Sequence, residues 1–224
     1  MIYKIFLDLH QRITLLTTLV NRLSLNIDKT RLLLFKSKYN KTVPDINIKM
    51  KGLRLVPSRS VKYLGVYLDD NLSWDIHIEE LTKKLSRTNG IISKLRQFVP
   101  NVTILRIYFS LFFSHLSYGI SVWSLTTQKN LDKISILQKK CIRIMNSLTY
   151  NDHTNPLFVE NKIIKFGDLI VTNQLLLAFE FKMKILPNDL NHLFTYTSDI
   201  HTHITSVSSS SYIPEIFTTN YGIY

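Results

Sequence analysis

The chain has 224 residues, of which 45% are hydrophobic, 6 are glycine and 6 are proline. This composition excludes a disordered tail and allows one or two ordinary hydrophobic cores. Because Cys141 is the single cysteine, neither an internal disulfide nor a cysteine-based zinc cluster can form, which fits a reducing compartment.

The formal net charge is +12 and is unevenly distributed. Residues 1–74 carry 13 Lys and Arg against 5 Asp and Glu, residues 75–150 carry 11 against 4, and residues 151–224 carry 4 against 7. A basic surface attracts nucleic-acid phosphates and anionic membranes alike, so charge alone does not identify the partner. We expect the partner-facing surface within the first two-thirds of the chain.

The first part of the chain changes its hydrophobic period near residue 22. Residues 5–22 have the apolar spacing of a helix, with no pattern of a targeting peptide. Four short apolar or alternating segments follow, separated by turn residues, and their pattern predicts antiparallel strands. These segments are Leu23–Asn26, Arg31–Lys36, Ile46–Met50 and Val61–Leu68.

From Trp74 onward the spacing is helical. One helix is predicted to end at Pro100, with an apolar face of Ile78, Leu81, Leu85, Thr88, Ile92, Leu95 and Val99. Lys83, Arg87 and Lys94 fall on nearly the opposite face, in the same stripe as Gly90. Such a stripe suits contact with a sugar-phosphate backbone, although by itself it is more often a solvated surface.

Three further helices are predicted, over residues 102–122, 128–145 and 168–184. The first is apolar enough to suggest a membrane span, but its Arg, His and Ser residues favour a buried core helix. The second turns Lys139, Lys140 and Arg143 away from its apolar face. A Ser/Thr-rich tail over residues 201–224 is expected to be poorly ordered. The fold class is therefore α+β.

Several motifs, in a fixed order, carry a resemblance to a known family. Asn26 precedes Lys29-Thr30 by three residues, an apolar strand follows, and a segment from Val61 to Trp74 contains Tyr63-Leu64-Gly65. Further matches are His77-Ile78, Lys94-Leu95-Arg96, Leu116 to Gly119, Trp123 and Leu137 to Ile144. Together they resemble the C-terminal part of the reverse transcriptases of non-LTR retrotransposons, which are LINE-like and of the jockey type.

The resemblance implies an organisation. Residues 1–73 would be the end of a polymerase palm with its primer-grip hairpin, and residues 74–150 a helical thumb that holds a template-primer duplex. Residues 151–200 would be a helical extension. The intact enzyme polymerises DNA on an RNA template with Mg²⁺, and its upstream half would be the natural partner of these residues, together with an RNA–DNA hybrid or RNA template-primer.

Tyr67-Leu68-Asp69-Asp70 formally spells the metal-binding box of reverse transcriptases. In the family that box precedes the strand of the Asn and Lys-Thr motif, whereas here it follows that strand. Phosphoryl transfer also needs a carboxylate from another strand. We therefore expect Asp69 and Asp70 to end a strand, with Asp70, Asn71 or Ser73 capping the next helix. No catalytic carboxylate and no metal site is assigned, so the chain alone is expected to be inactive.

Individual roles follow from the resemblance. Lys29 would contact the incoming triphosphate in the intact enzyme, and Lys62, Tyr63, Leu64 and Gly65 would form the primer grip. Thumb contacts with nucleic acid would come from Lys83, Arg87, Lys94, Lys139, Lys140 and Arg143. Trp74 and Trp123 suit base stacking but are more commonly core residues.

Two other functions remain open at the level of sequence. One is a helical protein-interaction module domesticated from such an element, and the other is a pseudogene product without a selected role. No membrane partner is expected. We expect an intracellular location, and the sequence does not distinguish the nucleus from the cytoplasm. Both ends of the chain are expected to fall within a longer reading frame.

Overall fold

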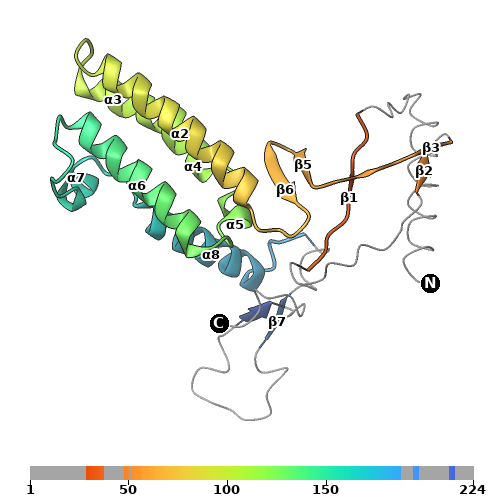
Figure 1. Cartoon of the computed structure of the whole chain (residues 1–224). Coiled ribbons are helices and arrows are strands. Elements are labelled where there is room, and N and C mark those ends of the chain that lie inside the picture. The colour runs from red at the N-terminus through yellow and green to blue at the C-terminus, as the bar shows by residue number, and fades with distance from the viewer. Residues whose placement is uncertain (1–28, 38–47, 51, 188–193, 197–211, 215–224) are drawn as a thin grey trace, which may run out of the picture.

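A computed structural model describes residues 29–37, 48–50, 52–187, 194–196 and 212–214. Its main body is a bundle of helices, and short strand pairs lie toward one end of that bundle (Figure 1). The helices are α2 (Asp75–Leu95), α3 (Asn101–Ile107), the π-helical η1 (Tyr108–Phe113), α4 (Ser114–Ser117), α5 (Ile120–Trp123), α6 (Gln128–Met145), α7 (Asn155–Glu160) and α8 (Phe166–Lys182).

The described strands are short and pair two by two. They are β1 (Leu32–Leu33), β2 (Lys49–Met50), β3 (Leu53–Arg54), β4 (Pro57–Ser58), β5 (Ser60–Tyr63), β6 (Val66–Asp69), β7 (Phe194–Tyr196) and β8 (Tyr212–Pro214). The pairs β2–β3, β5–β6 and β7–β8 are antiparallel. Helices and small sheets in separate parts of the chain confirm the α+β class.

One strand departs from the predicted antiparallel arrangement. β1 pairs with β4 in parallel, with Leu32 opposite Pro57 and Leu33 opposite Ser58. The connection between the two strands is long enough to return the chain in the same direction, as a parallel pair requires. Next to this pair, the Lys36 amide donates to the Asp70 carbonyl at 2.8 Å, so β1 is also tied to the end of β6.

The β5–β6 hairpin is attached to the helical core. Its two-residue turn has positive φ at both positions, 45° at Leu64 and 85° at Gly65, which matches the right-handed twist of the paired strands. Val66 and Leu68 of β6 pack against the buried core of the helices. The hairpin therefore has a fixed orientation relative to α2.

Helices α2 and α6 lie side by side and run in the same direction (Figure 1). The Asn89 side chain of α2 donates to the Leu137 carbonyl at 3.1 Å, and the Arg96 guanidinium after α2 donates to the Ile144 carbonyl at 2.6 Å. Residue numbers rise together on the two partners, as a parallel pair requires. The predicted bounds of residues 128–145 for α6 are confirmed.

The predicted apolar face of α2 is confirmed. Ile78, Leu81, Leu85, Thr88 and Ile92 are buried, and Leu95 and Val99 pack against the same core. The buried side chain of Gln138 adds polar cross-links within this core: it donates to the Tyr108 hydroxyl and the Ile164 carbonyl and accepts from the Phe166 amide. These bonds connect α6 to η1 and to α8.

The single helix predicted over residues 102–122 is wrong in two respects. A π-helical turn, η1, interrupts the α-helical hydrogen bonding. The helix then stops at Tyr118, whose backbone is extended, and Gly119 adopts φ 64° before α5 begins. Glycine takes this left-handed conformation at little cost, and the Trp123 indole donates to the freed Tyr118 carbonyl at 2.8 Å. The chain can thus turn sharply inside an apolar stretch.

Some predicted elements lie outside the described residues, namely the helix over 5–22, the strand Leu23–Asn26 and most of the tail. Within that tail, Tyr212–Pro214 form β8. Among the described helices, none has the length and apolarity to cross a bilayer. The domain divisions at residues 73, 150 and 200 stay predictions.

Candidate nucleic-acid interface

The turn of the β5–β6 hairpin is exposed. Tyr63 and Leu64 keep 63% and 73% of their surface accessible, and Lys62 and Gly65 are exposed as well. The Lys62 ammonium lies 5.4 Å from the centre of the Tyr67 ring, a cation–π contact across the hairpin. The hairpin therefore presents an exposed tip of Tyr63 and Leu64 with a cation beside it.

Tyr118 holds this turn against the helices. Its hydroxyl donates to the Leu64 carbonyl at 2.5 Å. A Cβ atom at Gly65 would meet the Tyr118 ring at 3.4 Å, and its φ of 85° disfavours any side chain there. Gly65 therefore permits the backbone conformation of the turn, while Tyr118 lies only at van der Waals distance from it.

The three cations predicted on α2 are all exposed but differ in their surroundings. Lys83 pairs with Glu79 at 2.9 Å and with Glu80 at 2.8 Å, and these carboxylates raise its pKa above the ordinary value. Arg87 and Lys94 have no acidic partner in the described part of the chain. Of the three, Arg87 and Lys94 are the cations most available to a phosphate.

Helix α6 contributes a second basic stripe. At 3.6 residues per turn, Lys129, Lys133 and Lys140 lie within about 40° of one another, as do the three cations of α2. Each stripe lies opposite the buried side of its own helix, and the two helices run parallel over one core. Both stripes therefore face outward on the same side of the α2–α6 pair, which we call the outer basic face.

Lys139 and Arg143 belong to a different part of α6. With Tyr150 and His153 they line an open depression of about 340 Å³ beside α7. The Arg143 guanidinium lies 5.6 Å from the centre of the Tyr150 ring, and its Nε donates to the Asp152 carbonyl at 3.1 Å. The predicted cations of α6 are thus divided between two surfaces.

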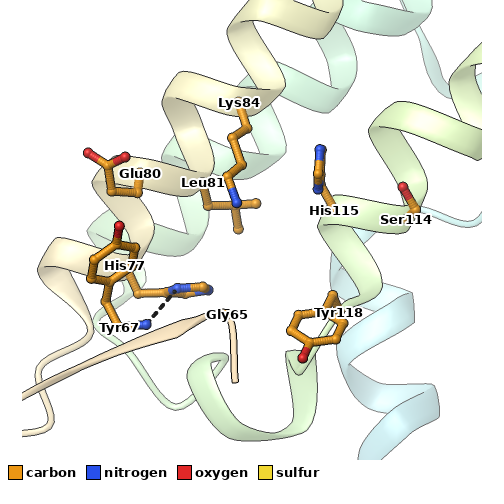
Figure 2. A pocket seen from close by; sticks show the side chains of 9 residues that line it. All are labelled: Gly65, Tyr67, His77, Glu80, Leu81, Lys84, Ser114, His115 and Tyr118. Carbon is orange, nitrogen blue, oxygen red and sulfur yellow. Dashed lines mark hydrogen bonds between the residues drawn. The ribbon is translucent and has the colours of Figure 1, made fainter. Parts of the chain in front are cut away.

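A cavity of about 160 Å³ lies where the hairpin turn meets α2 and α4. Figure 2 shows that His77 and Lys84 reach it from α2, His115 from α4 with Tyr118 directly after that helix, and Gly65 from the turn. None of His77, Lys84 and His115 was among the predicted site residues. The sequence separates them by up to 38 positions, so no local motif marks the cavity.

His77 is the most deeply buried polar group of this cavity, with 7% of its surface accessible. Its Nδ1 accepts the Tyr67 amide at 3.4 Å, while its Nε2 has no hydrogen-bond partner. Burial, helped by the nearby Lys84 charge, lowers the pKa of His77 to about 4. The ring is therefore neutral at pH 7, and since Nδ1 accepts a bond, the ring hydrogen is on Nε2.

The Asp69-Asp70 pair has structural partners. The Asp69 carboxylate is buried and accepts bonds from the Asn71 amide at 3.2 Å, the Ser73 amide at 2.7 Å and the Ser73 hydroxyl at 2.8 Å. Asp70 pairs with the Lys36 ammonium at 2.9 Å. These contacts agree with the predicted strand-ending role.

The start of α2 follows the predicted capping only in part. Trp74 occupies the N-cap position with φ 66° and provides no side-chain bond. The Ser73 hydroxyl accepts the Asp75 amide at 3.4 Å, whereas no cap bond comes from Asp70 or Asn71. Asp69 stabilises this strained turn from the strand side.

The two tryptophans, Cys141 and Lys29 are the remaining residues with a predicted location or role. Trp74 and Trp123 are buried, so they are core residues and present no free ring to a base. Burial raises the pKa of the Cys141 thiol, as expected for an apolar core position. Lys29 is exposed in a turn before β1. Among the described residues, no group of three or more His, Cys, Asp and Glu side chains comes together as a metal site.

Comparison with characterised proteins identifies relatives. The chain is 24% identical over 155 residues to the RNA-directed DNA polymerase from mobile element jockey of Drosophila melanogaster, and 26% identical over 127 residues to that of Drosophila funebris. This chain is related to a region of the non-LTR retrotransposon reverse transcriptases. A third relative is the probable RNA-directed DNA polymerase from transposon BS of D. melanogaster, 24% identical over 106 residues.

The similarity covers much of this chain but little of the relatives. The aligned residues make up 67%, 55% and 46% of the chain, and 17%, 14% and 12% of the three polymerases. No family model and no solved structure matches the chain. The predicted resemblance to reverse transcriptases is confirmed. Because the alignment covers only a small part of each polymerase, it does not show that this chain has polymerase activity.

Proposed function

We propose that this chain is a template-primer binding part of a non-LTR retrotransposon reverse transcriptase. In this proposal the β5–β6 hairpin is the primer grip, and the helices from α2 to α6 are the thumb. The outer basic face carries the proposal, because it places cations of two parallel helices on one side of the pair, and two of them, Arg87 and Lys94, have no acidic partner in the described part of the chain.

The chemistry of binding follows from the type of residue exposed. Arg87, Lys94, Lys129 and Lys140 are solvated cations on long side chains, suited to phosphates but without the fixed geometry that reads bases. We therefore expect binding to RNA–DNA hybrid or RNA duplex without sequence preference. Lys139, Arg143 and Tyr150 would extend the contact beyond that face. Binding of this kind releases counterions and weakens with salt.

Catalysis is not proposed for these residues. The Asp69 carboxylate accepts hydrogen bonds from the turn before α2, and the Asp70 carboxylate pairs with Lys36. Neither therefore presents a free carboxylate to two metal ions. Mg²⁺ chemistry and the triphosphate contact of Lys29 would require carboxylates of the rest of a polymerase. A nucleotide-incorporation assay on this chain should give no product above the protein-free background, and incorporation would overturn this part of the proposal.

The test of binding uses charge reversal on the outer basic face. Fluorescence anisotropy of a labelled RNA–DNA hybrid at low salt should rise saturably with the wild-type chain. The R87E/K94E variant should bind at least about 30-fold more weakly, since each lost phosphate contact contributes roughly a kcal/mol and the new acids repel the backbone. K182E/K184E, at and just after the end of α8, is the control with the same change of net charge and should bind as the wild type does.

A second function is supported by one feature, the exposed apolar surface of α8. Val171, Leu175, Leu176 and Phe179 each keep more than half of their surface accessible. A contiguous apolar patch on a helix is the usual mark of a protein interface. If the chain acts as a protein-interaction module, L175E should abolish partner binding, while R87E/K94E should leave it unchanged.

A further inference from the structure

The cavity beside the hairpin turn contains hydrogen-bond donors without acceptors. His77 Nε2 carries a hydrogen and has no partner, although the residue is more than nine-tenths buried. A buried donor left unsatisfied is destabilising, so its retention needs an explanation such as a ligand. Figure 2 shows the His77 ring extending from the Tyr67 amide toward the space between the hairpin turn and Tyr118.

The charges around this cavity favour an anion. Lys84 projects into it from α2, and its ammonium has no ion pair in the described part of the chain. The only acid among the lining residues is Glu80, whose carboxylate pairs with Lys83 at 2.8 Å and points away from the two histidines (Figure 2). His115 adds a second imidazole. The Lys84 ammonium and the Nε2–H of His77 are therefore left to a ligand, while the lining carboxylate is already paired with Lys83.

The size of the cavity fits a small oxyanion. A single water needs about 10–15 Å³ of comparable space, and the cavity offers about 160 Å³. A phosphate group with some water can therefore enter. The Tyr118 hydroxyl donates to the Leu64 carbonyl, so the side that carries the turn is already fixed before any ligand arrives.

We propose that this cavity binds a phosphate oxyanion through the Lys84 ammonium and the Nε2–H of His77, with His115 as a third contact. The cavity opens beside the exposed tip of the hairpin, so the phosphate is a phosphodiester of the strand that the hairpin contacts. That choice of source rests on the proposed function, whereas the site itself does not. Free phosphate offers the same oxygens and serves as the probe.

The first experiment titrates the full chain with inorganic phosphate and records the histidine side-chain nitrogen resonances. The His77 signal is assigned by its loss in H77Q. We expect a saturable shift of the His77 and His115 signals in the wild type. K84M keeps the aliphatic stem but removes the charge, and should weaken phosphate binding about tenfold, as expected for loss of one charge-assisted hydrogen bond.

Lys182 provides the matched control. It is exposed at the end of α8 and does not line the cavity. K182M removes the same charge and should bind phosphate as the wild type does. A His77 signal that does not move with phosphate, or an equal loss of affinity in K182M and K84M, would overturn the site. Circular dichroism of K84M establishes that the helices are intact.

The second experiment identifies the source of the phosphate. An RNA–DNA hybrid should shift the same two histidine signals, and a hybrid whose DNA strand carries uncharged methylphosphonate linkages should not. If phosphate moves His77 but the hybrid does not, the site stands and its assignment to the bound strand is overturned. Loss of hybrid binding in R87E/K94E with an unchanged phosphate titration separates the outer basic face from the cavity.

Discussion

The junction of the hairpin with α2 and the outer basic face use polar residues in opposite ways. At the junction, Asp69, His77 and Tyr118 are each held by specific hydrogen bonds and are buried or close to buried groups. On the outer basic face, Arg87, Lys94 and Lys140 are exposed side chains. Substitutions at the junction should therefore change stability, whereas those on the face should change binding alone.

The largest effect on stability is expected from Asp69→Ala. The substitution removes a buried carboxylate that accepts three hydrogen bonds, and it leaves the Asn71 and Ser73 amides without partners in a turn with positive φ at Leu72 and Trp74. We expect a loss of about 2–3 kcal/mol in the free energy of unfolding, measured by urea denaturation. Asp69→Asn retains one acceptor and should lose less.

The same substitution also tests whether the Asp69 carboxylate binds a metal ion. If Asp69→Ala left stability unchanged but abolished saturable Mn²⁺ binding, the carboxylate would be a ligand and its structural role would be wrong.

A smaller effect is expected from the titration of His77. Its pKa in the folded chain is about 4, below the ordinary value of 6.5, because burial disfavours the charged ring. Between these values the unfolded chain binds more protons, so stability should fall as the pH drops from about 6.5 to 4 and then cease to depend on this group. We expect a loss on the order of 1–2 kcal/mol.

The control for this pH dependence is H77Q, which has no titrating ring. Its unfolding free energy, measured in a buffer free of phosphate, should change less with pH over the same interval. An identical pH dependence in both proteins would mean that the pKa of His77 is the same in the folded and unfolded chain, which would contradict the effect of its burial.

The outer basic face should show the reverse behaviour. R87E/K94E should change the free energy of unfolding by no more than about 0.5 kcal/mol, the usual range for exposed positions, while hybrid binding falls. Equal losses of stability and binding would remove the distinction between the two regions.

The smallest effect separates two neighbouring cations on α2. K83M should weaken hybrid binding about twofold or less, since Lys83 is already paired with two carboxylates, whereas R87M should weaken it by about five- to tenfold. Anisotropy at one low salt concentration is sufficient. A larger effect of K83M than of R87M would mean that the pairs with Glu79 and Glu80 break on binding.

Prediction from sequence succeeded where one helix has one buried face. The spacing of Ile78, Leu81, Leu85 and Ile92 fixed the orientation of α2, and the bounds of α6 were also correct, because regular spacing on a long helix is a strong signal. The prediction failed at residues 118 and 119, where the helix ends although the surrounding sequence stays apolar. Gly119 was the local signal for this helix end, because glycine often ends a helix.

The candidate site was predictable only in its exposed parts. Lys83, Arg87 and Lys94 share a stripe that the sequence displays directly. The cavity, in contrast, joins a turn, one face of α2 and the end of α4, so its members meet only through tertiary packing. His77 adjoins the apolar stripe of α2 in sequence, and that adjacency is the one local signal for its burial.

The salt dependence of hybrid binding tests the central claim most directly. The logarithm of the association constant of the wild-type chain should fall linearly with the logarithm of the salt concentration, and R87E/K94E should reduce the slope by roughly 1.5–2 for two lost phosphate contacts. A shallow slope, or the same slope in both proteins, would contradict a phosphate-binding role for the outer basic face.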